Sequence, residues 1–174
     1  MSSPVHHTPL APSVDEPEVP VLPGFPSRVC IFAIDDSQYA VDLRHIREVL
    51  PIEFITPIPG LPPVVIGMTN VRGSVVPIID LRLLLGLRPR QLPPFAMVLR
   101  HEGYELAVLV DRAPEIITVT PDQFAPWIQG RPEESEARRQ IIDGAIKIDD
   151  AVIQILDVPQ LVVFLDSKET LDRV

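Results

Sequence analysis

The residues from Val64 to Gly86 constrain the fold more than any other stretch, because together they specify one strand–turn–strand–helix unit. Two apolar runs flank the short sequence Asn70-Val-Arg-Gly, and Gly73 can adopt the positive φ that a two-residue hairpin loop needs. Asp80 follows the second run directly, where it can cap the N-terminus of a helix. The stretch therefore predicts a β-hairpin that leads into a short helix.

The sequences of the expected helix and of the turn lead to two further predictions. Leu81, Leu84 and Leu85 fall on one face of the expected helix, and Gly86 is placed to end it. Arg72 puts a guanidinium group between two strands that we expect to be buried. The sequence therefore predicts that another group pairs with this arginine.

Turn residues between short apolar runs predict further hairpins. We expect strand pairs at 29–34 with 38–43, 95–100 with 105–110, and 141–148 with 151–156. A helical period spans 42–50 and ends at Pro51, and a short strand follows over 53–56. Residues 121–140, which include Trp127 and Gly130, read as a loop with a helical piece, and Asp157 begins a final helix through Phe164.

Both ends of the chain lack these patterns. Residues 1–27 are rich in proline and acidic residues, which predicts an extended tail or tether, and residues 167–174 read as a frayed end. The remaining residues, 28–166, form the expected folded domain, with a boundary between its two parts around 87–94.

The two parts of this domain resemble each other. The sequence Ser74-Val-Val-Pro-Ile-Ile-Asp aligns with Ala151-Val-Ile-Gln-Ile-Leu-Asp, which matches Asp80 with Asp157 and Gly67 with Gly144. Tyr39-Ala-Val has its counterpart in Leu106-Ala-Val. These matches predict two copies of a roughly five-stranded unit, and a unit of this size commonly closes into a barrel that leaves no free edge. The sequence leaves open whether the copies are tandem or exchange strands.

Composition argues against several functional classes. The formal net charge is −9 and aromatic residues make up 5%, which disfavours both nucleic-acid binding and docking on anionic lipid. Cys30 is the single cysteine, so no internal disulfide is expected, and its apolar run predicts a buried thiol. We find no signal peptide and no apolar run long enough for a membrane helix, so we expect a cytoplasmic protein.

Paired carboxylates raise the alternative of a small acidic β-barrel enzyme. Asp35-Asp36 and Asp149-Asp150 both fall at expected hairpin turns, where aspartate is ordinary turn chemistry. No phosphate-binding loop, metal-ligand spacing or activated nucleophile accompanies them. We therefore expect no catalytic residue, no metal site and no cofactor.

Five motifs follow one another between Val29 and Leu87. They are Phe32 before the Asp35 turn, Tyr39-Ala-Val-Asp-Leu, Ile46-Arg-Glu-Val, Ile55-Thr-Pro-Ile-Pro and, most specifically, Val65-Ile-Gly-Met-Thr-Asn-Val-Arg-Gly-Ser-Val-Val-Pro-Ile-Ile-Asp-Leu-Arg. In these motifs the chain resembles the CheW-like domains, the scaffold module of bacterial chemosensory arrays. The resemblance continues more weakly to the final helix. Ala40 replaces a usual glycine, and Leu50-Pro51 replaces a glycine-containing turn found in many members.

The resemblance implies a mainly β fold of two five-stranded β-barrel subdomains with short helices and a C-terminal helix. It implies a non-enzymatic adaptor that couples chemoreceptor tips to the regulatory domain of a CheA-type histidine kinase, recruited from the cytoplasm to membrane arrays. Other CheW-like domains are further expected partners. A related pathway such as twitching motility is the alternative within the family.

By the same resemblance, candidate binding residues lie around the arginine of the turn. For Arg72 two compatible interpretations stand: a receptor contact, or a structural ion pair with Glu48. Either a receptor contact or a core position is expected for Val41, Ile46 and Val49, and a binding role is expected for Asn70. Structural turn and cap roles are expected for Gly67, Gly73, Asp80 and Asp157.

Overall fold

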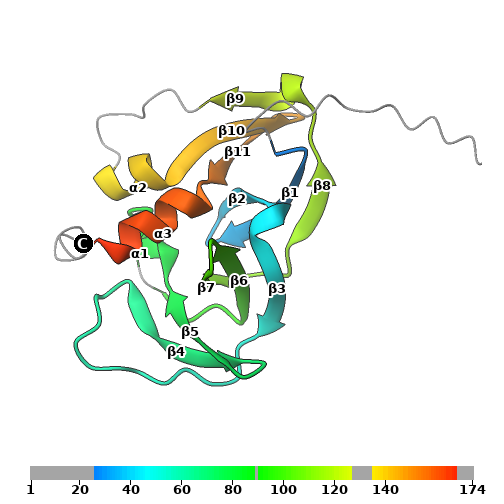
Figure 1. Cartoon of the computed structure of the whole chain (residues 1–174). Coiled ribbons are helices and arrows are strands. Elements are labelled where there is room, and N and C mark those ends of the chain that lie inside the picture. Colours follow the sequence, from blue (N-terminus) through cyan, green and yellow to red (C-terminus); the bar gives the residue numbers. More distant parts are fainter. Residues whose placement is uncertain (1–25, 89, 127–134, 168–174) are drawn as a thin grey trace, which may run out of the picture.

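The computed structural model describes residues 26–88, 90–126 and 135–167. Within them the chain is mainly β, as predicted, and its strands form two sheets (Figure 1). Sheet A has the order β8-β1-β2-β11-β10-β9. Its strands are β1 (Arg28–Ile34), β2 (Ser37–Asp42), β8 (Glu115–Thr118), β9 (Phe124–Pro126), β10 (Ile142–Ile148) and β11 (Ala151–Leu156).

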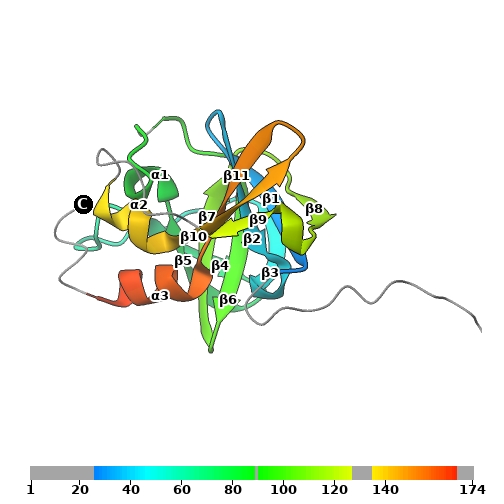
Figure 2. The ribbon, with the colours of Figure 1, turned by 90° about the horizontal axis from the view of Figure 1, so that it is seen from above.

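Sheet B has five strands in the order β3-β6-β7-β5-β4. They are β3 (Ile46–Pro51), β4 (Val65–Val71), β5 (Ser74–Ile79), β6 (Phe95–His101) and β7 (Tyr104–Val110). Two short 3₁₀ helices are described, η1 (Leu43–His45) and η2 (Pro121–Gln123). The three α-helices gather on one side of the molecule (Figure 2): α1 (Leu81–Leu84), α2 (Glu136–Ile141) and α3 (Val158–Asp166).

The two copies of the repeat exchange strands, which settles the question that the sequence left open. β11 pairs in parallel with β2, and β5 pairs in parallel with β7. The registers are equivalent, because Ile155 lies opposite Ala40 and Ile78 lies opposite Ala107. Each sheet therefore combines strands from both copies, and strands from either side of residues 87–94 occur in both sheets.

In each sheet, the segment that follows one edge strand crosses over and pairs with a strand at the opposite edge. After β3, Thr56 exchanges two backbone hydrogen bonds with Met68 of β4, of 2.8 and 2.9 Å. After β8, strand β9 pairs with β10. Sheet A thus gains a sixth strand where five were expected, and this strand is only three residues long. These returns shield the edges of β4 and β10.

The matched glycines explain how the chain comes so close at these returns. A Cβ on Gly67 would lie 2.6 Å from the carbonyl oxygen of Thr56. A Cβ on Gly144 would lie 2.7 Å from the ring of Phe124. Both glycines also sit at a shift in strand register. Both glycines therefore have a structural role, because any larger residue would collide with the returning segment.

The main hydrophobic core lies between the sheets and the helices. It includes residues of sheet A such as Phe32, residues of sheet B such as Met97, and Phe164 of α3. Two smaller apolar clusters are each built mainly from residues of one sheet, one from sheet A and one from sheet B. The core therefore joins the two copies into one packed unit.

Two local predictions are wrong. The helical period over 42–50 gives only the 3₁₀ helix at Leu43–His45, and Ile46–Pro51 is strand β3 because it pairs with β6. Residues 53–56 are not a strand, and only Thr56 forms a bridge. The final helix runs two residues beyond Phe164, and a helical piece exists as α2. The expected tail over residues 1–25, Trp127, Gly130 and residues 168–174 lie outside the described residues.

Candidate functional site

The turn between β4 and β5 has the geometry that its sequence predicts. Arg72 has φ 51° and Gly73 has φ 90°, both in the left-handed region that a two-residue hairpin turn requires. Asn70 is the penultimate residue of β4, and its side-chain oxygen accepts a hydrogen bond of 2.8 Å from the Gly73 amide. This hydrogen bond from the end of β4 holds the turn in place, and the Arg72 side chain is left exposed.

Arg72 pairs with Glu48, the carboxylate that we considered from the sequence. Its Nε donates to Glu48 Oε2 over 2.8 Å. The expectation of a guanidinium held between buried strands is wrong, because the Arg72 side chain is 75% exposed while that of Glu48 is 19% exposed. Glu48 lies on β3, so the pair joins this edge strand of sheet B to the turn between β4 and β5.

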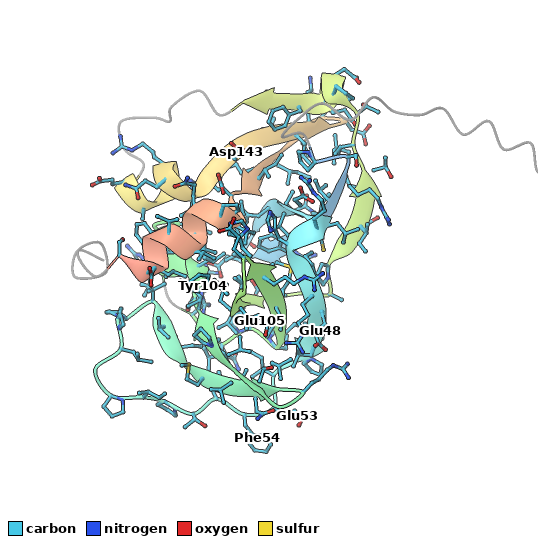
Figure 3. The ribbon with its side chains drawn as sticks, viewed as in Figure 1. Glu48, Glu53, Phe54, Tyr104, Glu105 and Asp143 are labelled. Atoms are coloured by element: carbon cyan, nitrogen blue, oxygen red, sulfur yellow. The ribbon has the colours of Figure 1, made fainter. Side chains whose placement is uncertain are left out.

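Two further ion pairs, both made by Arg47, extend from Glu48 into the sheet. Arg47 Nε lies 3.4 Å from Glu48 Oε1, and Arg47 Nη1 lies 2.7 Å from Glu105 Oε2 on β7. Figure 3 labels Glu48 and Glu105 at this part of sheet B. The alternating charges reach from the turn through β3 to β7, which orients the exposed arginine at one end of the network.

The three apolar candidates differ in accessibility. Val41 is fully buried in the main core, which favours its interpretation as a core residue. Ile46 is half-buried, and Val49 is 36% exposed on β3, next to Glu48. Only Ile46 and Val49 are therefore accessible to a partner in this structure.

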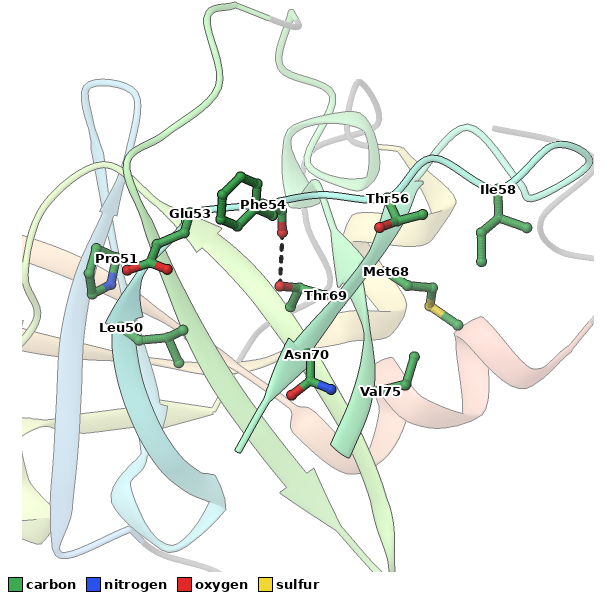
Figure 4. A pocket seen from close by; sticks show the side chains of 10 residues that line it. All are labelled: Leu50, Pro51, Glu53, Phe54, Thr56, Ile58, Met68, Thr69, Asn70 and Val75. Carbon is green, nitrogen blue, oxygen red and sulfur yellow. Dashed lines mark hydrogen bonds between the residues drawn. The ribbon is translucent and has the colours of Figure 1, made fainter. Parts of the chain in front are cut away.

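A groove that sequence reasoning missed lies between β3, β4 and the segment that connects them. Its volume is about 600 Å³, and Figure 4 shows its walls. The Thr69 hydroxyl donates a hydrogen bond of 2.9 Å to the carbonyl of Phe54, which ties the connecting segment to β4. The lining residues are mostly apolar: Leu50, Pro51, Glu53, Phe54, Thr56, Ile58, Met68, Thr69, Asn70 and Val75.

The groove presents an unusual amount of exposed apolar surface. Phe54 is 80% exposed, Val75 is 69% exposed and Ile58 is 41% exposed. Contiguous exposed apolar side chains mark interaction sites, and large aromatic residues often anchor them. The sequence offered one signal for this groove, which is a phenylalanine in the proline-rich connection between β3 and β4.

Asp80 has a second role that the sequence did not predict. It caps α1 as expected, with Oδ1 3.1 Å from the Arg82 amide. Its Oδ2 also accepts from Arg82 Nη2 over 2.8 Å, and both residues are buried. Arg82 Nη1 donates to the carbonyl of Gln91 over 3.1 Å, which fastens the connection to β6. Asp157 caps α3 as expected, but its Oδ1 accepts from the amide three residues on, that of Gln160, over 2.9 Å.

The structure offers nothing to the catalytic alternative. The aspartate pairs occupy hairpin turns, with φ 53° at Asp35 and 51° at Asp149. Burial raises the pKa of the Cys30 thiol to about 11, so the thiol stays protonated and is a poor nucleophile. The described residues contain no group of three or more metal-binding side chains and no helix long and apolar enough to span a membrane.

Comparison with known proteins identifies the family. Residues 28–164 match the model of the CheW-like domain. The chain belongs to the CheW-like family. A probable chemotaxis protein CheW from Rhizobium etli is 33% identical over 75% of this chain and 83% of its own length. Chemotaxis protein CheW from Thermotoga maritima is 28% identical over 81% of this chain and 91% of its own length.

A solved structure agrees with the fold. The scaffolding protein TtCheW from Thermoanaerobacter tengcongensis superposes with a TM-score of 0.69 at 24% identity, over 77% of this chain and 90% of that one. CheW-like proteins are adaptors and scaffolds rather than enzymes. The aspartate pairs at the turns therefore have no catalytic role in this chain.

Proposed function

We propose that this chain is a chemotaxis adaptor that couples the cytoplasmic tips of chemoreceptors to the regulatory domain of a CheA-type histidine kinase. The named relatives support the chemotaxis scaffold role. The observation that carries the coupling role is an exposed, mostly apolar groove beside an exposed, oriented arginine, both on sheet B. Such an adaptor acts in the cytoplasm and joins membrane arrays through its partners.

We assign the two neighbouring surfaces to different partners. The receptor surface comprises Arg72, Glu48, Ile46 and Val49, where half-buried and exposed apolar groups lie beside a charged side chain. The kinase surface is the groove around Phe54. An aromatic side chain that is 80% exposed offers a large apolar contact at low entropic cost.

Binding of single variants tests this assignment. We expect Arg72→Ala to weaken receptor binding at least tenfold while the melting temperature stays within a few degrees, because the side chain is largely exposed. We expect Phe54→Ser to weaken kinase binding by a similar factor. Val163→Ser is the matched control, since Val163 is 61% exposed on α3, outside both surfaces.

The measurement is titration calorimetry against a receptor tip fragment and the isolated kinase regulatory domain, with thermal melts alongside. If Arg72→Ala and Glu48→Ala both lose stability but keep their affinity for the receptor, the pair is a structural ion pair and not a receptor contact. A wild-type chain that binds neither partner would contradict the proposed function as a whole.

A further inference from the structure

A second pocket, of about 490 Å³, differs from the groove around Phe54 in both its place and its chemistry. It lies on sheet A, where β2 and β11 pair in parallel with Gln154 opposite Tyr39, and residues of both strands line it. The β1–β2 turn and the β10–β11 hairpin lie beside each other at this end of the sheet (Figure 2). Two arginines from outside the sheet complete the lining, and the structure explains how each is positioned.

Arg138 reaches the pocket from α2 and is held by neutral acceptors. Its Nη2 donates to Gln154 Oε1 over 2.9 Å, and its Nη1 donates to the carbonyl of Leu85 over 3.3 Å. The side chain of Arg138 is part-buried in these contacts. The guanidinium group is therefore fixed in place at the wall of the pocket.

Arg112 is held at the pocket by its neighbour in the chain. The Asp111 amide donates to the carbonyl of Ala33 over 3.0 Å, and the Asp111 carboxylate accepts from the Asp35 amide over 2.6 Å. These two bonds fasten the segment after β7 to the β1–β2 hairpin. Arg112 itself is exposed, and no ion pair within 4.0 Å joins it to another described residue.

Neutral hydrogen-bond donors accompany the two guanidinium groups. Ser37 and Tyr39 line the pocket from β2, and both carry a hydroxyl group. Burial raises the pKa of the Tyr39 phenol, so the phenol stays protonated and can donate a hydrogen bond. Guanidinium and hydroxyl donors together suit an oxygen anion, because such an anion accepts several hydrogen bonds at once.

The charges at this pocket favour an anion, although the chain as a whole has a formal net charge of −9. Its described lining residues include two arginines and a single carboxylate, that of Asp36. Lys147 lies opposite Val152 of the lining, so its side chain extends from the same face of sheet A. The described lining of the groove around Phe54 contains Glu53 and neither arginine nor lysine.

We propose that this pocket binds a small oxyanion, a phosphate or carboxylate group, against Arg112 and Arg138. The two guanidinium groups supply charged donors, and the hydroxyl groups of Ser37 and Tyr39 supply neutral ones. None of these residues belongs to the surfaces that we assigned to the receptor and the kinase. The site is therefore independent of the proposed adaptor function, and its failure would leave that function standing.

Titration of the full chain with anions tests the proposal. The probes are inorganic phosphate and citrate, each added at constant ionic strength against a chloride reference. We expect saturable changes in the amide chemical shifts of residues 36–39 and 151–154, together with a rising melting temperature, because a ligand that binds only the folded chain stabilises it. Saturation by one of the two anions supports the site and identifies the group that it prefers.

Two substitutions should change the affinity in opposite directions. Arg112→Gln removes a charged donor at an exposed position and should weaken binding by about tenfold or more. Asp36→Asn removes the opposing carboxylate and should tighten binding severalfold, and asparagine suits a two-residue hairpin turn. Arg139→Gln is the matched control, since Arg139 is exposed on α2 and is not among the described lining residues.

Three results would overturn the proposal. The first is a chemical-shift change that grows linearly with both anions and never saturates. The second is equal weakening in Arg112→Gln and Arg139→Gln, which would reflect net charge alone. The third is wild-type affinity in both Arg112→Gln and Asp36→Asn with unchanged melting temperatures, because the anion would then bind elsewhere on the chain.

Discussion

Two arginine–carboxylate pairs of equal length but different burial give a direct prediction of stability. Arg82–Asp80 and Arg72–Glu48 both have N–O distances of 2.8 Å, but the Arg82 side chain is 2% exposed and that of Arg72 is 75% exposed. Removing Arg82 leaves a buried carboxylate without its cation, which costs about 3–5 kcal/mol. Removing Arg72 leaves a carboxylate that water can reach, which costs about 0.2–1 kcal/mol.

The same substitution at both positions makes the comparison. We expect Arg82→Ala to lower the free energy of unfolding by about 3–5 kcal/mol and Tm by about 6–20 °C, at about 2–4 °C per kcal/mol for a chain of this size. We expect Arg72→Ala to lower Tm by no more than about 4 °C. Urea unfolding followed by circular dichroism, together with thermal melts, measures both values.

A double variant separates the uncompensated charge from lost packing. Asp80→Asn with Arg82→Leu keeps an N-cap side chain at the start of α1 and removes both charges, so it should recover part of the stability lost in Arg82→Ala. Equal unfolding free energies for Arg82→Ala and Arg72→Ala would refute the prediction that burial decides how much each ion pair contributes to stability.

Three further variants test other parts of the structure. Gly67→Ala and Gly144→Ala should each cost about 1–3 kcal/mol in urea unfolding, because the new Cβ meets the returning chain at 2.6 and 2.7 Å; unchanged unfolding curves would show that the chain can move away. Partial desolvation of the otherwise exposed Asp143 carboxyl, and then the charge of Asp157, raise the pKa of Asp143 above its usual value, so the ionised carboxylate lowers stability slightly at neutral pH. Asp143→Asn should therefore unfold at a higher urea concentration than the wild type at pH 7, and this gain should vanish as the pH falls below about 4, where the carboxyl is protonated in both folded and unfolded chains. A gain that does not depend on pH would contradict that origin.

The sequence predicted the repeat and its hairpins well because their signals are local. Two-residue turns, alternating apolar residues and aspartate caps act within a few positions, and all of the expected hairpins form. The match of Gly67 with Gly144 was also visible in the sequence. The contact that each glycine makes with a returning segment was not, because it joins residues distant in the chain.

The errors share one physical cause, which is that long-range pairing overrides local pattern. The helical period over 42–50 predicts a helix, yet β6 offers residues 46–51 a ladder of hydrogen bonds and they form β3. The exposure of Arg72 likewise depends on how the turn is oriented relative to the rest of the fold, which the local sequence of the hairpin does not determine. The apolar groove around Phe54 exists because the connection between β3 and β4 crosses between these two edge strands. The sequence of that connection shows its prolines and its phenylalanine, but not where the connection lies in the fold.

The central claim is that one chain holds a receptor and a kinase at the same time. Sedimentation velocity of a receptor tip fragment, the kinase regulatory domain and this chain tests it most directly. With the wild type we expect a single complex that contains all three. With Phe54→Ser we expect loss of the kinase domain alone, and with Arg72→Ala loss of the receptor fragment alone. Two separate binary complexes with the wild type, in which each partner displaces the other, would contradict it.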